Sequence, residues 1–205
     1  MKANVTSSST AIKDWPLSAA NHKIDLQPAQ NMISAHTPAG HGAYFTLNTI
    51  KGIITPVNAG IRYYFTIHNN VVTVMITGVK KIDIGKYDDL IDAKLAVGNS
   101  LNIVPANTDQ SIALTDAALC NRTYRASANF ADGRKGGMFG IEAINEIIRQ
   151  TGCAGLRFCF AKDADGVKTI VLYGVDTTGQ NLNTYVGDQN CPCPNFCGAV
   201  NPLNS

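Results

Sequence analysis

The stretch that decides the fold is AGLRFCF at residues 154–160, because a closely similar stretch, AGIRYYF, occupies residues 59–65. The two segments start 95 positions apart and share an Ala-Gly pair, an arginine and a final phenylalanine. Solenoid repeats recur after roughly 20–50 residues. This longer spacing instead predicts an internal duplication into two pseudo-symmetric halves.

The similarity continues on both sides of these segments. Three further pairs occur in the same order: 34–41 with 127–134, 45–54 with 139–148, and 71–79 with 167–175. Their offsets run only from 93 to 96 residues. Four matches in one order and at nearly one spacing favour duplication over chance.

Each half is predicted to contain a helix. Apolar residues recur at helical spacing in residues 138–150, and Gly152 follows directly, as glycine does after many helix ends. The counterpart in the first half is residues 45–54, which stop before Pro56. Shorter helices are predicted before these two, over 27–34 and 115–124.

Each half is also predicted to contain a β-hairpin. Residues 156–160 and 168–175 alternate between apolar and polar, and Asp165-Gly166 supplies a turn between them. Asn69-Asn70 takes the same place in the first half.

These elements predict an α+β fold built from an internally duplicated ααββ unit. The most economical arrangement is one antiparallel sheet with helices packed on one face. The segment between the halves is predicted to include an extra helix over residues 87–96. The predicted division is a polar N-terminal segment 1–23, unit 24–85, crossover 86–111, unit 112–186 and a Cys/Pro-rich tail 187–205.

Composition argues against several classes of function. The chain has 205 residues, 45% of them hydrophobic, and a formal net charge of only +2. It therefore has a core but no strong field of one sign, and nucleic acid is not the expected partner. No run approaches the length of a membrane span, and the start lacks an apolar signal region. We expect a cytoplasmic protein.

Arg62 and Arg157 occupy equivalent positions in the two halves, and Tyr64 is expected on the same strand face as Arg62. One interpretation places both arginines on a solvent face or in ion pairs with acids such as Asp83 or Asp176. A second makes them a pseudo-two-fold site for a carboxylate or phosphate. A third is a salt bridge between subunits.

The loop at residues 132–137 is glycine-rich and carries Arg134 and Lys135. It is predicted to lead into a helix N-terminus, which would suit an anion. It matches neither the P-loop nor the dinucleotide-binding pattern, so a surface loop is the alternative. His36 and His41 are read as loop histidines, with metal binding as the alternative.

Three cysteines, Cys191, Cys193 and Cys197, form a C-x-C-x₃-C run in the tail. They offer three of the four thiolates or imidazoles that structural zinc requires. The alternatives are a disulfide within the tail or to Cys153 or Cys159, and unpaired thiols. Reduced thiols are the default in the cytoplasm.

The second half and the tail resemble a family of small uncharacterised Bacteroidota proteins. The resemblance covers roughly residues 139–205 and depends on Gly152-Cys153-Ala154-Gly155-Leu156-Arg157 and on the Cys-Pro tail. Family members carry a similar gly-cys-x-gly-ile-arg strand and a Cys-Pro-Pro-x-Cys-like end, from which this tail departs at Cys193 and Asn195. The family has no known activity, so the resemblance implies no functional residue. It does imply a bacterial, cytoplasmic origin.

No catalytic motif is present, and we expect a non-enzymatic structural or binding protein that self-associates through its sheet edges or tails. The alternative is a small-anion or metal-binding module that uses the arginine pair or the cysteines. An enzyme of unknown class is the third hypothesis.

Overall fold

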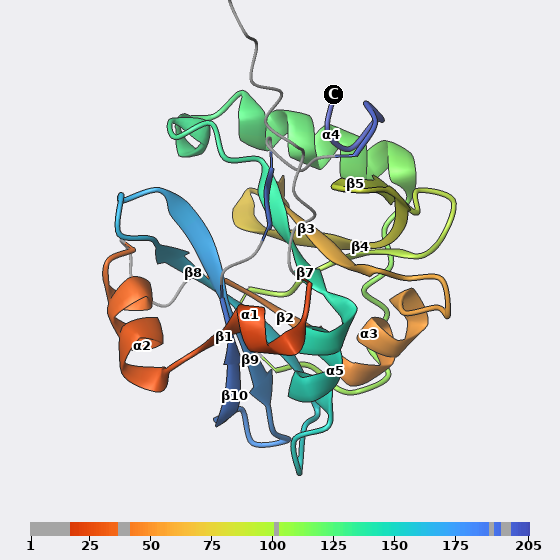
Figure 1. Cartoon of the computed structure of the whole chain (residues 1–205). Helices are drawn as coiled ribbons and strands as arrows, with labels where there is room; N and C mark the ends of the chain where they lie inside the picture. The colour runs from red at the N-terminus through yellow and green to blue at the C-terminus, as the bar shows by residue number, and fades with distance from the viewer. Residues whose placement is uncertain (1–16, 37–41, 101–102, 189–190, 194–197) are drawn as a thin grey trace, which may run out of the picture.

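A computed structural model describes residues 17–36, 42–100, 103–188, 191–193 and 198–205 (Figure 1). Its helices are α1 (Ala19–His22), α2 (Leu26–Ser34), α3 (Leu47–Ile53), α4 (Leu114–Arg125), the 3₁₀ turn η1 (Ala128–Phe130) and α5 (Ile141–Ile148). Its strands are β1 (Lys23–Ile24), β2 (Gly42–Thr46), β3 (Gly60–His68), β4 (Val71–Asp83), β5 (Lys86–Asp89), β6 (Leu95–Val97), β7 (Gly136–Gly140), β8 (Gly155–Lys162), β9 (Lys168–Val175), β10 (Asn181–Gly187) and β11 (Cys191–Cys193).

The strands form two antiparallel sheets, not the single sheet that was predicted. Sheet A has the order β1-β10-β9-β8-β2. Sheet B has the order β11-β7-β3-β4-β5, and β6 also pairs with β4. The α+β class is confirmed. The prediction of one sheet was wrong because each hairpin, β3–β4 and β8–β9, lies inside a sheet of its own.

The order helix, strand, helix, hairpin occurs twice, as α2-β2-α3-β3-β4 and as α4-β7-α5-β8-β9. The predicted ααββ unit therefore lacked a strand in each half. The first residues of the helices predicted over 45–54 and 138–150 are extended and belong to β2 and β7. Thr46 ends β2 and caps α3, since its hydroxyl accepts a hydrogen bond from the Thr49 N–H. The duplication itself stays a prediction.

The two halves exchange strands. β2 of the first half pairs with β8 of the second, and β7 of the second pairs with β3 of the first. The predicted units 24–85 and 112–186 are therefore interleaved and share one core.

Aromatic side chains fill the space between the sheets. Alternation along β3 turns Tyr63 and Phe65 inward, and alternation along β8 does the same for Phe158 and Phe160. The ring centroids of Phe65 and Phe160 lie 5.6 Å apart, and those of Tyr63 and Phe158 lie 6.1 Å apart, both edge-on. Such aromatic pairs add about 0.5–1.5 kcal/mol each beyond the area they bury.

Helices cover the outer faces of the sheets. The apolar side of α2 packs on sheet A around Cys159 and Tyr173, and α4 packs on sheet B near Tyr64. Figure 1 shows α4 at the top, over β3, and α2 at the left, beside β8. The predictions of these two helices, over 27–34 and 115–124, are confirmed.

Both predicted hairpins are also confirmed. Asn69 and Asn70 have φ values of 50° and 61°, so the β3–β4 turn uses two left-handed residues, a conformation that asparagine tolerates. The helix predicted over residues 87–96 was wrong. Residues 86–89 alternate between outward and buried side chains, and this period of two belongs to a strand.

Candidate functional site

Arg62 lies inside the protein, in a buried ion pair with Asp89. Its Nη1 is 3.2 Å from Asp89 Oδ1, and its Nη2 donates to the Tyr87 carbonyl oxygen at 2.9 Å. Neither side chain of the pair has any exposed area. The ion-pair interpretation of Arg62 thus fits the structure, although the acid is neither Asp83 nor Asp176.

Tyr64 belongs to the same buried cluster. Its hydroxyl donates to Asp89 Oδ2 at 2.7 Å, and Asn201 Nδ2 donates to that oxygen at 2.8 Å. Burial, followed by the charge of Asp89, raises the pKa of Tyr64 well above its usual value. Arg62 and Tyr64 are closed to solvent, which argues against the ligand-binding role predicted for them.

Lys135 and Arg134 lie in a loop that leads into strand β7, so the predicted helix N-terminus is absent there. The Lys135 ammonium donates to the Asn204 carbonyl oxygen at 2.5 Å. Arg125 contacts the same C-terminal segment through the Leu203 carbonyl oxygen at 3.2 Å. The Arg134 N–H donates to Asp132 Oδ1 at 3.1 Å. The contact between Lys135 and Asn204 therefore holds the C-terminal segment beside strand β7 of sheet B.

The cysteines are divided between two states. Cys193 is disulfide-bonded, whereas Cys120, Cys153 and Cys159 are free thiols. A disulfide sulfur is no zinc ligand, since zinc binds the thiolate. The side chains of Cys191 and Cys197 lie outside the described residues. Within the described residues, no three His, Cys, Asp or Glu side chains group so that they hold a metal ion.

Two histidines have structural contacts. His22 is buried, and its Nε2 accepts a hydrogen bond from the Gly140 N–H at 3.2 Å. The His36 ring lies on Phe160 with centroids 5.4 Å apart. His41, its partner in the proposed metal pair, lies outside the described residues.

Arg157 is the arginine that reaches a groove. It stands on the outer face of β8, beside α2, and is partly exposed. Its Nη1 donates to Asn181 Oδ1 at 2.5 Å and its Nη2 to the Gly179 carbonyl oxygen at 3.3 Å. Each of these nitrogens carries two N–H groups, so one N–H group on each remains to bind a ligand.

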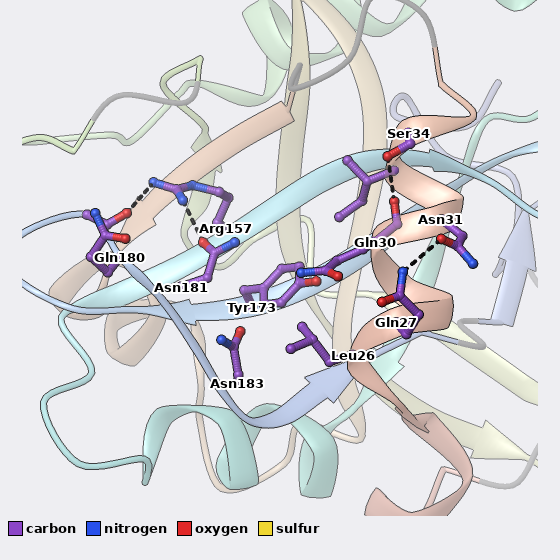
Figure 2. A pocket seen from close by; sticks show the side chains of 12 residues that line it. Leu26, Gln27, Gln30, Asn31, Ser34, Arg157, Tyr173, Gln180, Asn181 and Asn183 are labelled. Atoms are coloured by element: carbon purple, nitrogen blue, oxygen red, sulfur yellow. Dashed lines mark hydrogen bonds between the residues drawn. The ribbon is translucent and has the colours of Figure 1, made fainter.

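The groove runs between α2 and the outer face of sheet A and has a volume of about 610 Å³ (Figure 2). Its lining residues are Leu26, Gln27, Gln30, Asn31, Ile33, Ser34, Arg157, Tyr173, Gly179, Gln180, Asn181 and Asn183. Six of the twelve carry amides, and Arg157 is the only charged one among them. Figure 2 shows Arg157 and Gln180 toward one end, the α2 amides at the other and Tyr173 between them.

The lining of the groove carries one charged group, the Arg157 guanidinium, and its other polar groups are neutral. Burial raises the pKa of Tyr173 to about 12, so its hydroxyl remains protonated at neutral pH. Side-chain amides both donate and accept hydrogen bonds. The groove can therefore bind a carboxylate at Arg157 and hydroxyl or amide groups along its length.

Arg157 was a predicted ligand-binding residue, whereas the amides that α2 contributes to the groove were not predicted. Gln27, Gln30 and Asn31 are spaced at i, i+3 and i+4, which places them on one helix face. That spacing was a usable signal. No sequence pattern indicated Asn181 and Asn183 on β10, because only the pairing of β10 with β9 brings them into the groove.

The sheet edge at β2 is occupied. Gln110 accepts from the Thr46 N–H at 2.9 Å and donates to the Tyr44 carbonyl oxygen at 2.8 Å. Asn99 exchanges main-chain hydrogen bonds with Tyr44 on the same edge. This edge therefore offers little backbone for the predicted pairing with another copy.

Two further observations bear on the class of protein. Across the part of the chain that the structure describes, no helix has the length and apolar character needed to cross a membrane. No protein-family model, no curated protein and no solved structure matches the chain.

Proposed function

We propose that this protein is a non-enzymatic binding protein that takes a small hydroxylated carboxylate, such as a sugar acid, in the groove beside α2. The observation that carries the proposal is the position of Arg157, which is the one charged side chain among the described lining residues. A guanidinium binds a carboxylate through paired N–H donors. The surrounding amides match the mixed donor and acceptor pattern of hydroxyl groups.

The test compares an acidic sugar with its neutral analogue. We expect D-glucuronate, added in an NMR titration, to shift the amide signals of the groove, and D-glucose to bind about tenfold more weakly because it lacks the carboxylate. Arg157→Gln should reduce glucuronate binding by a similar factor.

Arg122→Gln is the matched control. It removes the same charge from an exposed position on α4, which packs on the opposite sheet. Equal binding of the two sugars, glucuronate binding that survives Arg157→Gln, or the absence of any binding would each contradict the proposal.

Self-association and the cytoplasmic location remain separate predictions. The occupied edge of β2 argues against self-association, and light scattering on the purified protein measures the oligomeric state directly. The disulfide at Cys193 argues against a cytoplasmic location, because disulfides rarely persist in the cytosol.

A further inference from the structure

A second cavity lies beside the β8–β9 hairpin and the η1 turn. It has a volume of about 460 Å³ and shares no lining residue with the groove beside α2. Val72, Phe160 and Ala128 give it apolar walls, and Lys162 and Lys168 bring two positive charges.

The two lysines form an unfavourable pair. Lys162 and Lys168 face each other directly across β8 and β9, and like charges in that position destabilise a sheet. Among the described residues, neither ammonium forms a salt bridge. An anion bound between them would relieve this repulsion.

Lys168 is the fixed member of the pair. Its Nζ donates to the Tyr124 hydroxyl at 2.8 Å and to the Asn129 carbonyl oxygen at 2.5 Å, and it lies 5.4 Å from the centroid of the Phe65 ring. An ammonium carries three N–H groups, so one N–H group of Lys168 remains to bind a ligand. Burial lowers the pKa of Lys168, and the nearby Asp132 carboxylate opposes that shift.

The charge of the cavity selects the ligand. The Asp132 carboxylate accepts from the main-chain N–H groups of Arg134 and Lys168, so both of its oxygens are engaged. The titratable lining residues are Lys162, Lys168, Asp132 and His36. With the histidine counted as neutral, two lysines against one carboxylate leave a single excess positive charge. The Lys162 ammonium has no hydrogen-bond partner among the described residues and can turn toward a ligand.

We infer that this cavity binds a small organic monoanion with an apolar body, such as an aromatic carboxylate. The carboxylate lies between Lys162 and Lys168, and the apolar body lies against Phe160 and Val72. This site is independent of the groove at Arg157.

The test uses benzoate as the probe, with benzamide as its neutral isostere, in NMR titrations of the full chain. We expect benzoate to shift signals around Phe160 and Lys162, and benzamide to bind about tenfold more weakly. Lys162→Gln should weaken benzoate binding by a similar factor, and Lys162→Arg should retain most of it because the charge is kept.

Lys51→Gln, which removes an exposed charge from α3, is the matched control and should change nothing. Lys162→Gln should also leave glucuronate binding at Arg157 intact, which separates the two sites. The inference is wrong if benzamide binds as well as benzoate, if benzoate binding survives Lys162→Gln, if Arg157→Gln abolishes it, or if benzoate does not bind.

Discussion

Asp89 shows how much of the fold depends on one buried carboxylate. It receives Arg62 from β3, the Tyr64 hydroxyl from the same strand and the Asn201 amide from the C-terminal segment. Breaking a buried ion pair leaves an uncompensated charge, which costs about 3–5 kcal/mol. We therefore expect Asp89→Ala to lower the free energy of unfolding by about that amount, as measured by urea denaturation.

The control for this prediction is an exposed ion pair. Asp83 and Lys86 pair at 3.5 Å on the β4–β5 hairpin, where their side chains are 61% and 63% exposed. Asp83→Ala should change stability little because water screens the pair. If the two variants lost stability equally, the buried cluster would not have the role described above.

At the scale of elements, the Gln110 side chain forms the hydrogen bonds that a neighbouring strand would form along the edge of β2. Gln110 satisfies one main-chain donor and one main-chain acceptor of β2 from a buried position. Gln110→Ala leaves the Thr46 N–H without a partner, at about 1–3 kcal/mol, whereas the Tyr44 carbonyl oxygen keeps the bond from the Asn99 N–H. We expect lower stability in urea and a concentration-dependent rise in mass by light scattering, because the freed edge can pair with another copy.

Gln180→Ala supplies the comparison, since Gln180 is exposed and caps no strand. A stable, monodisperse Gln110→Ala protein would mean that Asn99 alone protects this edge.

At the scale of the whole molecule, buried tyrosines make the fold sensitive to alkali. Burial raises the pKa of both Tyr173 and Tyr185 to about 12, and it raises those of Tyr64 and Tyr124 as well. In an unfolded chain, tyrosine ionises near its ordinary pKa of 10.0. Between these values the unfolded chain releases protons that the folded chain retains, so stability falls as pH rises.

We therefore expect urea midpoints to be insensitive to tyrosine ionisation below about pH 10 and to decline from there toward about pH 12. Tyrosinate absorbance should rise together with the loss of folded structure. Tyr185→Phe, which removes one of the four groups, should make the decline shallower. Tyrosines that titrate near pH 10 in a folded chain would contradict the prediction.

The local patterns of the chain specified the two hairpins and four of the helices. Period-two alternation and the turn residues at 69–70 and 165–166 predicted both hairpins, and apolar residues at helical spacing in 138–150 predicted the helix that the structure shows as α5. Strands β2 and β7 were missed because each has only five residues and runs directly into a helix. Their apolar side chains fit the helical pattern equally well, so local periodicity could not separate the two structures.

The sequence by itself determined the α+β class, the two hairpins and the arginine that stands at the same position in each. Tertiary structure alone decided what became of those arginines. Arg62 meets Asp89 because β5 adds to sheet B, and Arg157 opens into an amide-lined groove because β10 and α2 lie beside β8. The physical reason is that alternation sets the face on which a side chain stands, whereas its neighbours come from strands and helices far away in the sequence.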